Sequence, residues 1–138
     1  EAIVLAQEVR EIRVQKVTAI RNYLLEELLH IDGVVLNGSR IQRVANNVNV
    51  SISGIDAEFA VVVLDEHGIA CSTKSACSGA GGAGSSVVRA ISGDEDRAIS
   101  AIRFTLGEET TRTDVSRAAR ELAVHIEKTR TTIDALTQ

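Results

Sequence analysis

The spacing of apolar residues divides the chain into helical and extended segments. From residue 2 to residue 30, apolar side chains recur every three or four positions, and charged residues such as Glu8 and Arg13 take most of the others. This spacing is typical of one face of an α-helix. The apolar stripe consists of Leu5, Val9, Ile12, Ile20, Leu24 and Leu28. The pattern predicts one long helix that ends before Gly33.

Four shorter stretches favour strands. Residues 34–36 are β-branched or apolar and precede an Asn-Gly turn signal, and residues 47–53 alternate polar and apolar side chains. Residues 101–106 show the clearest period of two, with Ile102, Phe104 and Leu106 on one face and Arg103 on the other. A short strand over residues 69–72 is also expected.

Helix-start residues precede the remaining apolar stripes. Asp56 suits the N-cap of a helix that runs through Leu64 and ends near residues 67–68, and a short helix is expected at 85–91. Residues 94–100 form a polar link for which a helix is one option. Thr110, Thr111, Thr113 and Asp114 favour the start of a final helix, whose stripe comprises Val115, Ala118, Leu122, Ile126 and Ile133. Together these elements predict an α+β fold, in which long terminal helices pack on one face of a small, mainly antiparallel sheet of three to four strands.

Composition restricts the class of protein. A chain of 138 residues with 44% apolar and 25% charged residues suits one domain, which we assign to residues 1–138. A net charge of −4 argues against direct nucleic-acid binding, and no apolar run is long enough for a membrane span. Two cysteines favour a reducing cytoplasm. Because the chain starts at Glu1 and contains no Met, we interpret it as part of a longer or processed protein.

Cys77 is the first candidate for chemistry. It is followed by Gly79, Gly81, Gly82 and Gly84, which favours a loop that presents the thiol instead of burying it. The nearby cation of Lys74 and the N-terminus of the next helix would both favour the reactive thiolate. A free cysteine without function is the plain alternative. Cys71, in an apolar stretch, is expected to be structural.

Other chemistry has weaker support in the residues. The glycine loop lacks the spacing of a phosphate-binding loop, and Cys71 and Cys77 lack a second pair of metal ligands. His67 is expected near a helix C-terminus, and neither His30 nor His125 is expected to be catalytic. Arg103 is either a solvent-facing arginine on an edge strand or a planar fork for a carboxylate, and the residues alone leave both open.

Three ordered blocks resemble a known family. They are Asn-Asn-Val-Asn-Val-Ser at 46–51, the run from Leu64 through Asp-Glu-His-Gly to Ser-Ala-Cys at 75–77, and Ala-Ile-Arg-Phe-Thr-Leu-Gly at 101–107 followed by two threonines. The chain resembles the C-terminal domain of the cysteine desulfurases, which are pyridoxal-phosphate-dependent class V aminotransferase-like enzymes. The resemblance covers nearly the whole chain.

The resemblance implies a mechanism of sulfur transfer. In this family a loop cysteine takes the sulfur of L-cysteine as a persulfide, alanine leaves, and the sulfur passes to acceptors for iron–sulfur cluster assembly or RNA thiolation. Cys77 matches the nucleophile and Arg103 matches the arginine that holds the substrate carboxylate. Cys77 is also implied as a transient iron–sulfur ligand shared with a partner, without any resident metal. The implied partners are L-cysteine and a sulfur-acceptor or scaffold protein, and homodimer formation is left open.

The resemblance also implies a missing part. The lysine that anchors pyridoxal 5'-phosphate belongs to the family's large domain, and Lys16, Lys74 and Lys128 do not match its motif. We therefore expect no cofactor-binding residue in this chain and no turnover by it alone. The alternatives are a stand-alone sulfur-relay or interaction module, and a degenerate structural domain. The roles of Cys71 and Lys74 stay open.

Overall fold

The computed structural model describes residues 2–73 and 84–137, and within them it contains a three-stranded antiparallel sheet. The strands are β1 (Val34–Leu36), β2 (Asn47–Ile52) and β3 (Ala101–Thr105), in the order β1-β2-β3. β2 pairs with both neighbours, with Asn49 opposite Arg103 and Ser51 opposite Val35. The α+β prediction is confirmed, and each of these strands lies within one residue of its expected bounds.

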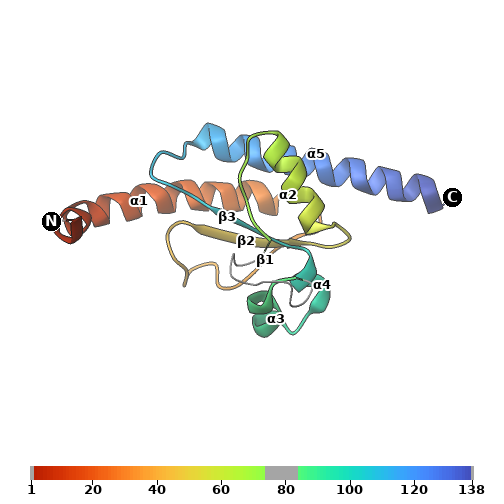
Figure 1. Ribbon diagram of the computed structural model, residues 1–138, viewed down its shortest axis with the longest axis horizontal. Coiled ribbons are helices and arrows are strands. Elements are labelled where there is room, and N and C mark those ends of the chain that lie inside the picture. The colour runs from red at the N-terminus through yellow and green to blue at the C-terminus, as the bar shows by residue number, and fades with distance from the viewer. Residues whose placement is uncertain (1, 74–83, 138) are drawn as a thin grey trace.

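The sheet buries one face against the long helices α1 (Ala2–Leu29) and α5 (Arg112–Thr137) (Figure 1). Val48, Val50 and Ile102 on that face are fully buried, because alternate residues of a strand point to the same side. Leu28 and Leu122, from the two helices, are also fully buried in the same cluster.

The terminal helices run side by side and in the same direction (Figure 1). Tyr23 Oη lies 2.9 Å from Ser116 Oγ, and the Arg112 guanidinium lies 4.0 Å above the Tyr23 ring. Each helix extends beyond the sheet at its own end: Ile12 of α1 is 73% exposed and Ile133 of α5 is 48% exposed. These two residues belong to the predicted stripes, so only the halves of the helices that cross the sheet contribute to the core.

Helix α2 (Ala57–Glu66) begins at the predicted N-cap. Asp56 Oδ1 accepts hydrogen bonds from the backbone N–H groups of Glu58 and Phe59. The expected strand at 69–72 was wrong: only Ser72 pairs with β3. The amide of Ile69 still donates to the carbonyl of Leu64, so the chain is leaving the helix over the residues where a strand was expected.

Two short helices lie on the other side of the sheet, α3 (Ser86–Ser92) and α4 (Glu95–Ile99) (Figure 1). Ser85 and Asp94 cap them by accepting hydrogen bonds from the N–H groups of Val88 and Arg97. Val88, Ala98 and Ala101 form a second, smaller apolar cluster there. The sheet is therefore covered on both sides, but the short helices leave part of the polar face open to a cavity.

Candidate functional site

A cavity of about 300 Å³ lies on the polar face of the sheet and contains Arg103. Asn47, Asn49 and Arg103 form its floor, because they occupy the strand positions that alternate with the buried residues. Val87 and Ile91 of α3 form a wall. The expectation that Arg103 points away from the core agrees with this position.

Arg103 is held at its backbone and left unengaged at its side chain. Its N–H donates to the carbonyl of Ser72 at 2.7 Å, and its carbonyl accepts from the Ser72 N–H at 3.1 Å. Within residues 2–73 and 84–137, no hydrogen bond or ion pair engages the guanidinium. A half-buried arginine with five N–H donors and no acceptor is suited to a planar anion.

The electrostatic environment of the cavity is positive. Arg43 also lines it, and its guanidinium donates to the backbone carbonyls of Asn37, Ser39 and Asn47. Burial, and after it the neighbouring charge of Arg21, lower the pKa of Arg43. Neither Asp nor Glu is among the described residues that line the cavity. The site therefore favours a negatively charged ligand.

Described residues on either side of the segment that carries Cys77 line this cavity. Cys77 itself lies outside the described residues, but Thr73 and Ser85, on either side of its segment, both line the cavity. Gly84, the first described residue after that segment, has φ +82°. A Cβ there would lie 2.5 Å from the Ala98 carbonyl oxygen, so only glycine fits.

Cys71 is not suited to nucleophilic chemistry. It packs against the main core, and burial, followed by the charge of Asp65, raises the pKa of its thiol to about 11. The thiol is therefore protonated at neutral pH, whereas the thiolate is the reactive form. The structural reading of Cys71 agrees with this environment.

The histidines lie apart from the cavity. His67 is the C-cap of α2, with Nδ1 2.8 Å from the carbonyl of Val63, and His30 makes the equivalent contact with Glu26 at 2.7 Å. His125 is buried with its ring 5.6 Å from that of Phe59. In the described part of the chain, no group of three or more His, Cys, Asp or Glu side chains is arranged to hold a metal ion.

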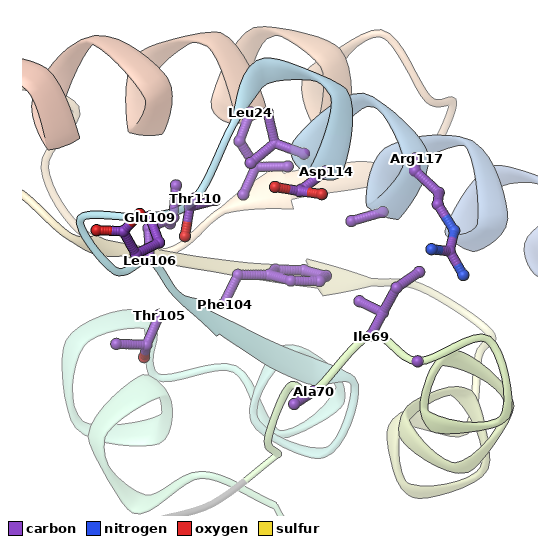
Figure 2. A pocket seen from close by; sticks show the side chains of 13 residues that line it. Leu24, Ile69, Ala70, Phe104, Thr105, Leu106, Glu109, Thr110, Asp114 and Arg117 are labelled. Carbon is purple, nitrogen blue, oxygen red and sulfur yellow. The ribbon is translucent and has the colours of Figure 1, made fainter.

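A second cavity, of about 380 Å³, lies on the other face, where the chain at residues 69–70 diverges from β3 (Figure 2). Figure 2 shows Phe104 across its centre, with Asp114 and Arg117 from α5 at its edge. Both charges are engaged: Asp114 accepts from Thr111, and Arg117 donates to the His67 carbonyl. This cavity is mixed in charge and is less suited to an anion than the one beside Arg103.

Sequence reasoning missed the polar groups around Arg103. Asn37, Asn49 and Arg43 were not singled out, although the alternation at 47–53 already placed Asn47 and Asn49 on one face. The signal was available in that period of two, because Arg103 occupies the matching face of the next strand. Arg43 carried no periodic signal, since it lies in the irregular segment between β1 and β2.

Comparison with known proteins agrees with this architecture. The family model described as aminotransferase class-V matches residues 2–118. The chain belongs to that family. The protein named cysteine desulfurase IscS from Dictyoglomus turgidum is 37% identical over 132 residues, which are 95% of this chain and 34% of that protein. The one from Ehrlichia chaffeensis is 36% identical over 131 residues, 94% and 32% of the two chains.

Solved structures show the same fold. A structure described as a NifS-like protein superimposes with a TM-score of 0.75 at 20% identity and covers 89% of this chain and 30% of its own. A NifS-like protein from Rickettsia africae gives a TM-score of 0.68 at 20% identity, with 92% and 31% coverage. The chain thus spans about a third of the length of the curated relatives that it matches.

Among the described residues, no helix combines the length and apolarity needed to cross a membrane.

Proposed function

We propose that residues 1–138 form the small, persulfide-carrying domain of a pyridoxal-phosphate-dependent cysteine desulfurase. Family membership and the names of the curated relatives support this proposal. The structural observation that carries it is the unengaged guanidinium of Arg103 in a cavity whose described lining contains no acidic side chain.

Arg103 binds the carboxylate of L-cysteine in this proposal. A guanidinium presents parallel N–H groups that match the two oxygens of a carboxylate, and its partial burial strengthens the attraction. The antiparallel pairing on one side and Ser72 on the other restrict the backbone from which the side chain projects. The side chain therefore holds one end of the substrate while leaving the thiol end free.

Cys77 accepts the sulfur. It follows Thr73, which lines the cavity, by four residues in the sequence. The Cys77 sulfur forms a bond to the sulfur of L-cysteine as the carbon–sulfur bond of the substrate breaks. The electron pair of the broken bond stays with the substrate carbon, which gains a proton as the substrate thiol loses one. The products are a cysteine persulfide and alanine, so atoms and electrons balance.

Among the described residues, none is placed as the lysine that anchors the cofactor in this family. Lys16 and Lys128 are exposed on α1 and α5, and Lys74 lies outside the described residues. No described lysine lines either cavity. Pyridoxal phosphate, on which class V aminotransferases depend, is thus assigned to a large domain that this chain does not contain. The chain supplies substrate binding and the sulfur acceptor.

The remaining assignments follow from the family. The persulfide is delivered to a sulfur-acceptor or iron–sulfur scaffold protein. During this delivery, Cys77 and the partner together act as transient ligands of an iron–sulfur cluster. We assign this work to the cytoplasm, where free thiols persist. A homodimer, if formed, would be built mainly by the large domain.

Persulfide formation tests the proposal. The chain is mixed with a complementing large domain, pyridoxal phosphate and L-cysteine, and the intact mass and the released alanine are measured. We expect one added sulfur on the wild type and on Cys71→Ser, and none on Cys77→Ser. Persulfide and alanine in undiminished amounts from Cys77→Ser would show that the nucleophile is misassigned.

A sulfur relay without turnover is the second candidate, and the lack of a fitting lysine among the described residues favours it. The chain would then take sulfur from a persulfide donor in the absence of any cofactor or large domain. A gain of one sulfur under those conditions, with no alanine formed in the complemented mixture, would replace the first proposal with this one.

A further inference from the structure

A closed network of hydrogen bonds adjoins the Arg103 cavity, whose lining includes Asn37 and Asn49. Arg97 Nη2 donates to Asn37 Oδ1 at 2.8 Å, and Asn37 Nδ2 donates to Ser51 Oγ at 2.7 Å. Ser51 Oγ donates in turn to the Arg97 carbonyl at 2.6 Å. Asn37 Nδ2 also donates to Asn49 Oδ1 at 2.7 Å. Asn37 and Ser51 are buried, so the bond between them is shielded from water, and the other three bonds are partly buried.

Arg97 determines the direction of every bond in this network. A guanidinium has donors and no acceptor, so the Asn37 atom that faces it must be the carbonyl oxygen. The amide nitrogen of Asn37 then faces Asn49, and the Asn49 atom that it meets must be an acceptor. The orientation of both amides follows from chemistry, although oxygen and nitrogen are hard to distinguish by shape.

This orientation directs the Asn49 amide nitrogen away from Asn37. Within the described residues, no hydrogen bond engages Asn49 Nδ2, and Asn49 lines the same cavity as Arg103. The two residues are direct partners across β2 and β3. Leu106 donates to the Asn46 carbonyl and Ile52 to the Ser100 carbonyl, so the intervening Asn49–Arg103 pair is the non-hydrogen-bonded type, whose Cα atoms lie about 4.5 Å apart.

We propose that Asn49 is a specificity-determining residue whose side-chain N–H donates to the same carboxylate that Arg103 binds. This inference rests on the proposed function and adds a residue to its substrate site. A carboxylate offers about four lone-pair positions, and an arginine fork uses two of them. A neutral donor beside the fork takes a third, so the pair selects amino acids that retain the carboxylate over the corresponding amines.

Ligand titrations of the 138-residue chain test this inference. L-cysteine and cysteamine, which lacks the carboxylate, are titrated under reducing conditions while the side-chain amide and guanidinium NMR signals are followed. We expect L-cysteine to shift the Asn49 Nδ2 and Arg103 signals. Asn49→Ala should weaken L-cysteine binding about tenfold, which corresponds to about 1.4 kcal/mol, and should leave cysteamine binding unchanged.

Two matched variants separate a direct hydrogen bond from Asn49 to the ligand from a purely structural role of the network. Ser51→Ala opens the network but keeps the Arg97–Asn37–Asn49 order, so it should retain L-cysteine affinity. Asn46→Ala removes an exposed amide outside the cavity and should also retain it. In the unliganded wild type, we expect nuclear Overhauser effects from the Asn49 amide protons to Arg103, and from the Asn37 amide protons to Ser51.

The outcomes distinguish this inference from the proposed function. If Arg103→Ala abolishes L-cysteine binding while Asn49→Ala leaves it unchanged, Arg103 keeps its role and the Asn49 inference is overturned. Equal weakening of both ligands by Asn49→Ala would make Asn49 a structural residue, which also overturns it. If the wild type shows no L-cysteine-dependent shift at either residue, both assignments fail. If Asn49→Ala does not fold, the unliganded wild type provides the test. Nuclear Overhauser effects from the Asn49 amide protons to Asn37 instead of Arg103 would overturn the inference.

Discussion

The two faces of strands β2 and β3 differ in what their side chains contact. Val48, Val50 and Ile102 are fully buried against α1 and α5, whereas Asn49 and Arg103, from the alternating positions, border a cavity. One face contributes apolar burial to stability, and the other presents donors to a ligand. The two faces share a backbone but have different neighbours. Substitutions one residue apart should therefore affect mainly stability on one face and mainly ligand binding on the other.

The largest effect is expected on the apolar face. Ile102→Ala should lower the free energy of unfolding by about 2–5 kcal/mol, since it leaves a cavity among fully buried side chains. Urea denaturation measures this loss. Arg103→Ala is the matched control, and it should change stability by no more than about 0.5 kcal/mol, since its guanidinium has no partner among the described residues. Equal losses at both positions would contradict the division of the sheet.

Arg103 should dominate ligand binding. In the complemented enzyme, Arg103→Ala should raise the KM for L-cysteine about 10- to 100-fold, because a hydrogen bond to a charged group contributes about 1.5–3 kcal/mol. Arg103→Lys should recover only part of the affinity, since an ammonium keeps the charge and loses the planar fork. Steady-state kinetics with both variants checks this, and an unaltered KM in Arg103→Ala would reject the role.

A smaller effect is expected in the buried network on the polar face. Ser51→Ala removes the acceptor of one Asn37 N–H and the donor to the Arg97 carbonyl, and should cost about 1–2 kcal/mol of stability. Ser53→Ala, at the exposed position two residues later, is the control and should be close to neutral. Thermal and urea unfolding of the pair would show whether buried polar groups contribute to stability on this face.

The smallest expected effect is a pH dependence of stability that comes from His125 of α5, which belongs to neither sheet face. Burial, and after it the charge of Lys128, lower the pKa of His125 from 6.5. The unfolded chain therefore binds a proton more readily, and stability should fall as pH decreases from about 7 to about 5. His125→Gln should reduce this slope, and His30→Gln, at an exposed position, should not. A slope that is the same in all three proteins would remove His125 as its source.

Local patterns predicted most of the helices and strands. The Asp56 cap and the Thr111–Asp114 start of α5 each depend on neighbours within four residues, so the sequence contains the whole signal. The strand at 34–36 was predicted from its local residues, and the fold supplies its pairing partners at 50–52. The strand at 69–72 failed because the hydrogen bond from Ile69 to Leu64 competes with pairing to β3. That competition depends on where α2 ends relative to the sheet.

The candidate site was predicted in part. Arg103 could be chosen because a family resemblance assigned it a role, while the residues alone left two readings open. The cavity around it combines side chains that are distant in the chain, such as Asn37 and Arg103. Asn37 is in turn held by a 2.8 Å bond from Arg97, which lies 60 positions away in the sequence. Cys77 was chosen from its neighbours in the chain, and its placement lies outside the described residues.

The sequence by itself determined the alternation that separates apolar from polar positions on β2 and β3, because side-chain direction in a strand has a period of two. It also determined the helix caps, which are local hydrogen bonds. Only the tertiary structure decided that Asn49 lines the cavity beside Arg103 with its Oδ1 bonded to Asn37. That orientation requires the guanidinium of Arg97, which the fold brings to Asn37, and a donor without acceptors dictates the direction of each bond that follows.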